Sequence, residues 1–365
     1  MAAEETEDPA EAGDQPGERR HHRPPGVQVG SEALAGLAPD WAALHASVPG
    51  SPLFLHPSWF AAWLRHFGRS CAPVFLAFRL DEELVAVAAL DLDADDARQL
   101  GDPNVMDYAG LLVLPGHESA VADALFDWLA ADMTRHLRLW GLREDDPAAA
   151  AIGAQADGNG WEVTVEPEAV CPRITLPASW DAYLTGLSKH ERHELRRKLR
   201  HLETAGTVTF ERALGIEAVA GMDRFIDFMR TSRTDKAAFL TPEMEAFFRD
   251  LASAFATDAE EGGVLGPRNS ELGTRMWAGS LTLDGRPIAM LFAFEDATTV
   301  SLYNSGYDPE YGSLAAGLLS KVLAIRDAIT RGKTTFDFLR GVEQYKARLG
   351  GVGLGVRRMS LRRRY

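Results

Sequence analysis

Hydrophobic and polar positions change period several times along the first half of the chain. Residues 73–80 and 83–92, PVFLAFRL and ELVAVAALDL, are short β-rich runs separated by acidic residues, which is typical of a β-hairpin. Residues 108–115, YAGLLVLP, predict a third strand. Residues 118–133 carry apolar side chains at helical spacing, and residues 136–142, HLRLWGL, predict another strand. The first half therefore predicts one β-β-β-α-β unit.

The same order of elements returns from about Arg275. A hairpin (WAGSLTLDG and RPIAMLFAFED), a strand (TTVSLYNSGYDP), a helix (SLAAGLLSKVLAIRDAITRG) and a strand (KTTFDFLRG) follow one another. Such self-similarity indicates a diverged internal repeat. We expect an α/β fold with a mixed sheet (α+β), in which a helical insertion separates two similar units.

Three segments are expected along the chain. Residues 1–30 are rich in Glu, Asp, Pro and Gly and predict a disordered tail, because they cannot bury enough apolar surface to become ordered. Residues 31–170 and 171–365 are expected to be the N-terminal and C-terminal domains. Within the second, the polar segment 260–273, EEGGVLGPRNSELG, is a loop long enough to cover a site.

Composition and charge narrow the classes of function. The 38 basic residues against 53 acidic ones give a net charge of −15, which argues against a general nucleic-acid coat protein. Only Cys71 and Cys171 are present, without the spacing of a disulfide framework or a structural zinc site. No apolar stretch approaches the roughly 18 residues of a membrane span, and the acidic start lacks the apolar core of a signal peptide. We expect a cytoplasmic protein.

The start of the predicted helix at Ser313 is the best candidate for a binding site. The first backbone N–H groups of a helix have no partner inside it and suit a phosphate or diphosphate, and Gly312 and Gly317 allow a ligand to come close. The alternative is that Gly312 only forms a turn and Ser313 only caps the helix. In the first half Glu118 occupies the first turn of the matching helix and would repel an anion, so an anionic cofactor is expected only in the second half.

Asp337 is the second candidate. Alternation along FDFLRG places Phe336 and Phe338 on one face of the strand and Asp337 on the other, so a charged group stands in a sheet position that should be buried and needs a partner. Further polar residues follow at the carboxyl end of the strand, where open α/β sheets collect ligands: Arg340, Glu343, Tyr345 and Lys346. Asp337 either fixes the turn by pairing with Arg340 or binds substrate.

Residues 187–203, LSKHERHELRRKLRHLE, predict a basic helix in an acidic protein. Arg196 lies on its charged surface. This surface is either simply solvated or recognises a phosphorylated substrate, the phosphates of a cofactor, or tRNA. His190 and His193 lie one turn apart without an obvious third ligand, so no metal site is expected. The signatures GxSxG and GxxxxGK[ST], typical of hydrolases and NTPases, are absent from the sequence.

The second half resembles a known family. LSKHERHELRRKLRHLE, GSLTLDGRPIAMLFAFED and the run from SLYNSGYDPEYGSLAAG to FDFLRGVEQYKARLG resemble, in this order, the CelD-type acetyltransferases of the GNAT superfamily. The resemblance covers about residues 175–350, and a weaker resemblance extends over about residues 53–145. Such proteins are similar to Fem-type aminoacyltransferases in having two GNAT-like units.

The resemblance implies a metal-independent transfer of an acyl group from acetyl-CoA or another acyl-CoA to an amine or hydroxyl of a small molecule or cell-envelope precursor. The implied cofactor-binding residues are Asn304, Ser305, Tyr311, Gly312, Ser313, Leu314 and Ala315. The implied acids and bases are Tyr303, Tyr307 or Tyr345 for the thiolate and Asp337 or Glu343 for the acceptor. The expected substrate-binding residues are Arg340, Lys346 and Arg196.

Two alternatives remain open from the sequence. One is an aminoacyltransferase that draws on charged tRNA through the basic helix. The other is a non-catalytic binding module of a polysaccharide or secondary-metabolite pathway.

Overall fold

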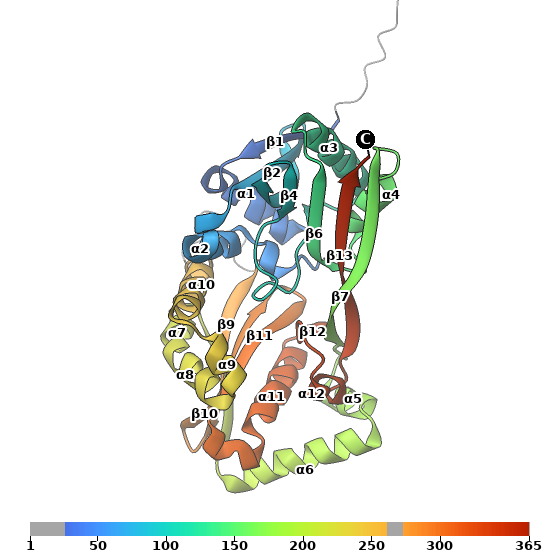
Figure 1. The fold of residues 1–365 in the computed structure, drawn as a ribbon. Coiled ribbons are helices and arrows are strands. Elements are labelled where there is room, and N and C mark those ends of the chain that lie inside the picture. The colour runs from blue at the N-terminus through green and yellow to red at the C-terminus, as the bar shows by residue number, and fades with distance from the viewer. Residues whose placement is uncertain (1–25, 261–272, 365) are drawn as a thin grey trace, which may run out of the picture.

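A computed structural model describes residues 26–260 and 273–364 (Figure 1). Most of the expected tail and of the loop 260–273 lies outside these residues. The strands are β1 (Gln28–Glu32), β2 (Pro73–Leu80), β3 (Glu83–Asp93), β4 (Asp96–Gln99), β5 (Leu112–Val113), β6 (His136–Arg143), β7 (Trp161–Thr175), β8 (Val208–Leu214), β9 (Arg275–Leu283), β10 (Arg286–Glu295), β11 (Thr299–Tyr307), β12 (Thr335–Asp337) and β13 (Val352–Arg363).

The helices connect and cover these strands. The α-helices are α1 (Leu34–Ser47), α2 (Pro57–Phe67), α3 (Glu118–Ala131), α4 (Pro147–Gln155), α5 (Trp180–Gly186), α6 (Lys189–Ala205), α7 (Gly215–Ala220), α8 (Met222–Ser232), α9 (Thr234–Phe239), α10 (Pro242–Glu260), α11 (Ala316–Thr330) and α12 (Gln344–Arg348). The described residues also form short 3-10 helices, which are η1 (Leu53–Leu55), η2 (Gly68–Ser70) and η3 (Pro309–Leu314). None of the helices in the described ranges is long and apolar enough to cross a membrane.

The strands form one mixed sheet whose order is nearly a mirror image about its centre. The order is β1-β2-β3-β4-β6-β13-β7-β12-β11-β10-β9-β8, with β5 attached to β3. Each half has an antiparallel hairpin, β2–β3 or β9–β10, followed by a parallel pair, β4–β6 or β11–β12. A helix, α3 or α11, connects the strands of each parallel pair. The expected mixed α/β class with two similar units is confirmed.

The two central strands are exchanged between the units. β7 follows the first unit in sequence, yet its C-terminal end pairs with β12 of the second unit. β13 ends the second unit, yet it pairs with β6 of the first unit and along its whole length with β7. The domain boundary expected at residue 170 therefore falls inside a strand, and the exchange makes the sheet continuous.

Two details of the first unit differ from the sequence prediction. The third strand is β4 at Asp96–Gln99, because the chain turns back directly after β3 through Ala94, whose φ is 53°. The segment 108–115, expected to be that strand, contributes only the two residues of β5. In addition, β1 begins at Gln28, inside the expected tail, because it pairs with β2.

Helices pack on both faces of the second unit. α8 and α10 cover one face with an aromatic cluster that includes Phe225, Phe247, Phe248 and Phe292. α11 covers the other face with Leu319, Val322 and Ile325, each completely buried. Burial of side chains of this size stabilises the fold by about 1.5–3 kcal/mol each. The two helical layers hold β11 between them, and this strand borders the site described next.

The basic helix predicted from the sequence is α6, which lies across the bottom of Figure 1. It begins after Ser188, whose hydroxyl accepts a hydrogen bond from the Glu191 N–H, and it buries Leu195 and Leu202. Arg196 is exposed.

Candidate functional site

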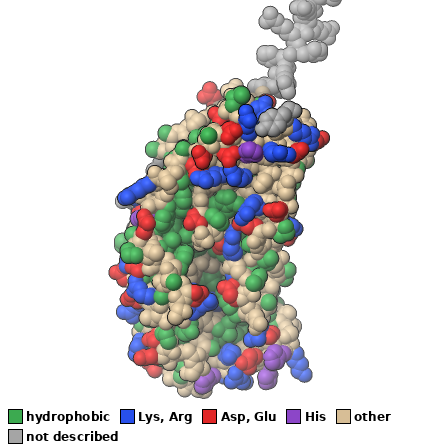
Figure 2. Space-filling view, viewed as in Figure 1, with side chains coloured by type: hydrophobic (Ala, Val, Ile, Leu, Met, Phe, Trp, Pro, Cys, Tyr) green, Lys and Arg blue, Asp and Glu red, His purple; other side chains and the backbone are tan. Residues whose placement is uncertain are grey.

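A gap opens in the sheet where β11 continues beyond its partner β12. The parallel pairing ends at Ser301 and Asp337, but β11 runs on to Tyr307. On the other side of the gap the chain turns at Leu339, whose φ is 57°, and enters α12. A cavity of about 310 Å³ occupies this region and is lined by β11, the start of α11, the segment from Ser232 to Lys236 and the start of α12. Figure 2 shows this side of the molecule hollowed over its lower half.

A β-bulge shapes the edge of β11 at the gap. Phe292 pairs with Asn304 and Ala293 pairs with Leu302, so Tyr303 is the extra residue. Two residues after Tyr303, Ser305 directs its backbone toward the gap. Its N–H donates to Asn304 Oδ1 at 2.9 Å, and its carbonyl oxygen accepts a hydrogen bond from Lys236 Nζ.

The start of α11 forms the second wall. The helix begins at Ala316, after the 3-10 helix η3 and after Ala315 in the left-handed conformation with φ 57°. Ser313 is thus not the helix cap predicted from the sequence, because it lies inside η3. No side chain of the described residues caps α11, so the N–H groups of Ala316 and Gly317 in the first turn, both at the cavity, can serve a ligand. A Cβ at Gly317 would lie 2.7 Å from the Tyr307 ring, so only glycine fits.

Positive charge dominates the cavity. Arg233, Lys236 and Lys321 line it, with Glu343 as the acidic member. Lys321 is 7% exposed, and its Nζ donates to the Gly317 carbonyl at 2.6 Å and lies 5.3 Å from the centroid of the Tyr345 ring. Burial, reinforced by the nearby Lys236 charge, lowers the pKa of Lys321 to about 7. Burial likewise lowers the pKa of Lys236 to about 8.

These two lysines lack the partners that buried cations usually have. Within the described part of the chain, neither Lys236 nor Lys321 forms an ion pair with a carboxylate; their hydrogen bonds go to the neutral oxygens of Asn304, Ser305 and Gly317. A buried ammonium without a counter-ion is unfavourable, so an anion that enters this cavity gains attraction from both.

Glu343 and Tyr345 face the same cavity from the start of α12. Although burial raises the pKa of Glu343, its own backbone N–H and Lys346 outweigh this effect and hold its pKa below the ordinary value. Glu343 is therefore a carboxylate able to accept a proton. Burial raises the pKa of Tyr345, whose ring packs against Phe338 with 6.0 Å between the centroids.

The structure brings together most of the residues expected to act at this place. Those that line the cavity are Ser305, Tyr307, Gly312, Ala315, Glu343 and Tyr345. Asn304 reaches it through its hydrogen bonds with Ser305 and Lys236. Tyr311, Ser313 and Leu314 belong to η3 beside the cavity but do not line it.

Tyr303 lies elsewhere. Its hydroxyl donates to the Val105 carbonyl at 3.1 Å, and its ring packs in the aromatic core against Trp59, Phe292 and Phe294. The role of proton donor expected for Tyr303 does not fit this position, because the bulge turns its side chain into the core instead of the gap.

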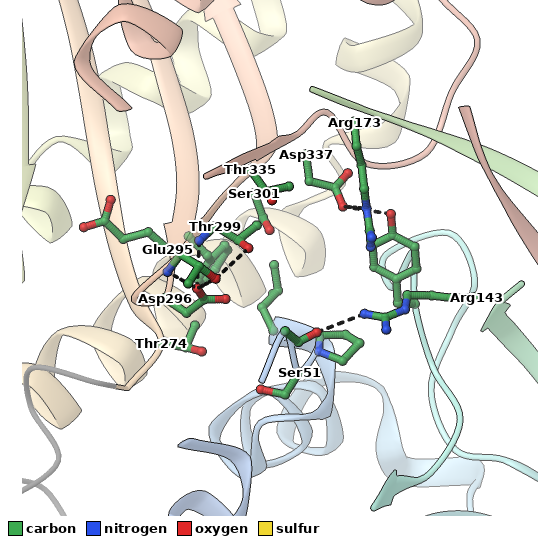
Figure 3. A pocket seen from close by; sticks show the side chains of 16 residues that line it. Ser51, Arg143, Arg173, Thr274, Glu295, Asp296, Thr299, Ser301, Thr335 and Asp337 are labelled. Atoms are coloured by element: carbon green, nitrogen blue, oxygen red, sulfur yellow. Dashed lines mark hydrogen bonds and ion pairs between the residues drawn. The ribbon is translucent and has the colours of Figure 1, made fainter. Parts of the chain in front are cut away.

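Asp337 lies at a different pocket, between the two units (Figure 3). As expected it is buried, but its partner is Arg173 at 2.7 Å and not Arg340. Asp337 also accepts hydrogen bonds from the Tyr108 hydroxyl at 2.8 Å and the Leu339 N–H at 2.7 Å. All its contacts thus fix the turn after β12 and join the units. The pocket measures about 230 Å³, and Figure 3 shows Arg143 and Ser51 of the first unit on the opposite side from Asp337. The Arg143 guanidinium donates to the Gly50 carbonyl at 2.9 Å.

Arg340 and Lys346, expected to bind substrate, are engaged within the protein. Arg340 contacts Glu168 at 3.2 Å and Asp107 at 3.4 Å, and burial raises the pKa of Asp107 to about 6. The buried Lys346 donates to the Leu339 and Arg340 carbonyls at 3.1 Å and 2.7 Å, and it contacts Glu343 at 3.0 Å. Neither lines the cavity, so both hold the turn that carries Glu343.

The sequence analysis missed the three cations of the cavity. Lys321 had a signal, because it interrupts the apolar run LAAGLLSKVLAI on a helix whose neighbouring positions are buried. Lys236 and Arg233 had none, since they reach the cavity only because α8 packs closely on Gly306 of β11. As for metals, a search of the described residues finds no group of three or more His, Cys, Asp or Glu side chains able to hold one.

The first unit has a smaller cavity at the equivalent place. It measures about 170 Å³ and is lined by the segment between α1 and α2, the start of α3 and the start of α4. Its charged residues are Glu118, Arg143, Asp145 and Asp146.

Comparison with known proteins identifies the fold. Residues 189–347 match the sequence profile of a family described as acetyltransferase (GNAT) domain. The crystal structure of FemX is similar to this chain with a TM-score of 0.60 at 12% identity, over 91% of this chain and 96% of FemX. A search among curated proteins finds no match.

Two further solved structures share the fold. A conserved protein of unknown function from Bacteroides thetaiotaomicron gives a TM-score of 0.56 at 11% identity, over 92% of this chain and 100% of that chain. The C-terminal domain of a putative lysylphosphatidylglycerol synthetase from Agrobacterium fabrum gives 0.50 at 11% identity, over 90% and 92%. The chain has a GNAT-type acyltransferase fold.

Proposed function

We propose that this protein is an acyltransferase that moves an acyl group from acyl-CoA to an amine or hydroxyl of a small molecule or cell-envelope precursor. The observation that carries the proposal is the cavity in the gap between β11 and β12, where the uncapped start of α11 and three cationic side chains converge. The further assignment to the CelD-type branch, to the cytoplasm and to metal-independent chemistry rests on the sequence resemblance.

The residues present fit a thioester carrier with an anionic end. The N–H groups of Ala316 and Gly317 supply donors for a diphosphate. Arg233 adds positive charge beside them, while its Nε and Nη2 donate to Asp235 at 2.9 Å and 2.7 Å. The carrier supplies an activated acyl carbonyl, and the Ser305 N–H is a backbone donor directed at the gap where that carbonyl would lie.

The reaction needs a base for the acceptor and an acid for the departing thiolate, and we assign these roles to Glu343 and Lys321. Glu343 accepts the proton of the acceptor's amine or hydroxyl as the new bond forms, directly or through water. The departing thiolate needs a proton, and Lys321 is a stronger acid than Tyr345, because burial lowers the pKa of the lysine to about 7 and raises that of the tyrosine. A lysine of this pKa can protonate a thiolate, whose conjugate acid has a pKa of about 8.5.

Isothermal titration tests the donor site. The full chain is titrated with acetyl-CoA, longer acyl-CoAs and free CoA, and Arg233→Glu is compared with wild type. Binding that Arg233→Glu weakens supports the proposal, whereas a folded wild-type protein that binds none of these compounds contradicts it. A thermal-shift screen of amines, amino acids, aminoglycosides and nucleotide sugars then identifies the acceptor.

A second candidate is an aminoacyltransferase that uses charged tRNA. It is favoured by α6, whose exposed Arg196, Arg197 and Arg200 form a basic surface, and by the contact of α6 with η3 beside the cavity. RNA bound on α6 would thus lie near the same gap. A salt-dependent mobility shift of tRNA that is lost when the three arginines become Glu would favour this candidate over acyl-CoA.

A further inference from the structure

An oxygen atom of the protein itself occupies the gap beside Ser305. The side-chain oxygen Oδ1 of Asn304 accepts one hydrogen bond from the Ser305 N–H and another from Lys236 Nζ, both at 2.9 Å. A backbone amide and an ammonium thus converge on one sp² oxygen. Donors at about 2.7–3.1 Å are what stabilises a carbonyl oxygen on which negative charge develops.

The two donors are fixed, while the Asn304 side chain is replaceable. Ser305 is held by strand pairing with Leu291, and Lys236 has a second bond to the Ser305 carbonyl. The Asn304 backbone is held by its pairing with Phe292, so the side chain can turn away without disturbing the sheet. When it does, the Ser305 N–H and one proton of Lys236 are left facing the gap.

Lys236 is suited to this task by its surroundings. It is partly buried on α9 and points into the cavity, and, as described above, no carboxylate of the described residues pairs with it. An ammonium in a region of reduced dielectric attracts a developing negative charge more strongly than it would in water.

We propose that Lys236 is a catalytic residue and that Asn304 Oδ1 marks the place of the thioester carbonyl oxygen. This inference rests on the proposed acyl transfer. As the acyl group enters, Asn304 rotates out, and Lys236 and the Ser305 N–H bind the carbonyl oxygen of the ligand in its place.

The reaction at this oxygen is balanced as follows. The lone pair of the acceptor forms the new bond to the carbonyl carbon, and the π electrons move to the oxygen held by Lys236. They return as the C–S bond breaks, the acceptor's proton passes to Glu343 and the thiolate takes a proton from Lys321. Asn304 therefore competes with the substrate, and Lys236 acts on the reacting oxygen.

A matched pair of ligands tests the proposal on the full chain. Acetyl-CoA has the carbonyl oxygen, and S-ethyl-CoA, a thioether, lacks it. We expect wild type to prefer acetyl-CoA and Lys236→Met to reduce this preference about tenfold, the size expected for one charge-assisted hydrogen bond. Asn304→Ala should bind acetyl-CoA about threefold more tightly, because its competitor is gone, and leave S-ethyl-CoA unchanged.

Infrared spectroscopy supplies a readout independent of affinity. The carbonyl stretch of acetyl-CoA labelled with ¹³C at the carbonyl should fall to lower wavenumber on binding to wild type and fall less in Lys236→Met. Lys189→Met, at an exposed lysine of α6, is the matched control and should behave as wild type. Lys236→Gln replaces Lys236→Met if circular dichroism shows that the methionine variant is unfolded.

Two results would overturn the inference. An unchanged preference and an unchanged carbonyl frequency in the Lys236 variants, with both ligands still bound, remove the role of Lys236 and leave the acyl-CoA site intact. No binding of either ligand to wild type removes the proposed function itself.

Discussion

The two units place a cavity at the same point of the same topology, yet they fill it with opposite charge. In the second unit Arg233, Lys236 and Lys321 line the cavity against one acidic residue, Glu343. In the first unit Glu118, Asp145 and Asp146 stand against one cation, Arg143. A fold of this kind offers two similar hollows, and the side chains decide which of them can take an anion.

The helix starts differ in the same sense. In the first unit Asp146 caps α4 by accepting hydrogen bonds from the Ala148 and Ala149 N–H groups at 2.9 Å and 3.4 Å. Glu118 stands at the start of α3 and accepts a hydrogen bond from the Gly116 N–H. Neither α3 nor its counterpart α11 has a cap from a side chain of the described residues, but the first turn of α3 carries the Glu118 carboxylate and the first turn of α11 carries no acidic residue. A phosphate at the helix start would therefore be repelled in the first unit and not in the second.

Breaking the ion pair between Arg173 and Asp337, which joins the two units, should have the largest effect of the changes proposed here. Among the residues that the structure describes, Arg173→Met leaves the buried Asp337 with the Tyr108 hydroxyl and the Leu339 N–H as its donors, so we expect a loss of about 2–3 kcal/mol in the free energy of unfolding. Urea denaturation measures it, and Arg326→Met, at an exposed position of α11, should stay within about 0.5 kcal/mol of wild type. Equal stability of the two variants would show that the pair does not hold the units together.

Removing one cation from the second-unit cavity should weaken its affinity for an anionic ligand. Lys321→Met takes away a buried ammonium that has no carboxylate partner among the described residues, so we expect acetyl-CoA affinity, measured by titration, to fall about 10- to 30-fold. Glu118→Gln, the matched change in the first unit, should leave that affinity within twofold. A clear gain of affinity in Glu118→Gln, as expected when a repelling carboxylate is removed from a binding site, would instead locate the ligand in the first-unit cavity and contradict our proposal.

Binding of an anionic ligand in the second-unit cavity should be accompanied by proton uptake, because this cavity contains lysines with lowered pKa values. The pKa of Lys321 is lowered to about 7 and that of Lys236 to about 8, so at pH 8 both are partly deprotonated. An anionic ligand favours their charged forms and raises both pKa values, so binding should take up about 0.5–1 proton at pH 8 and little below pH 6, where both are already charged. Titration in two buffers of different ionisation enthalpy measures this. Proton release at pH 8 would contradict it.

The smallest effect is expected on α6. Because Arg196, Arg197 and Arg200 are exposed and do not line the cavity, changing all three to Glu should alter acetyl-CoA affinity by less than about twofold in 0.15 M salt. A much larger loss would mean that α6 contributes directly to donor binding.

The sequence predicted the repeated units, because hairpins and amphipathic helices leave a local pattern of apolar positions. It missed β4, since the four residues DARQ show neither alternation nor β-branched side chains. It could not show the exchange of β7 and β13, because pairing between residues nearly two hundred positions apart leaves no local signal.

The candidate site was predicted in position but not in chemistry. Local pattern predicted a helix that starts at Ser313, whereas α11 begins at Ala316 after η3, and it predicted polar residues in the turn that carries Glu343. The partner of Asp337, the engagement of Lys346 by backbone carbonyls and the cavity position of Lys236 all depend on contacts across the fold. The sequence analysis expected Tyr303 to point to the same side of β11 as Ser305 and Tyr307, as it would in a strand without a bulge. The bulge at Tyr303 changes the alternation, and the side chain packs in the aromatic core instead.

The exchange of β7 and β13 also bears on how the gene can be edited. Val352–Arg363 completes the sheet beside β6, so a stop codon introduced before residue 352 would strip a neighbour from the first unit, although the deleted residues are encoded after the second. Neither half can be expressed alone without baring a long row of backbone hydrogen-bonding groups, which invites aggregation. Any attempt to transplant the cationic cavity into another scaffold would have to carry β7 along with residues 175–350.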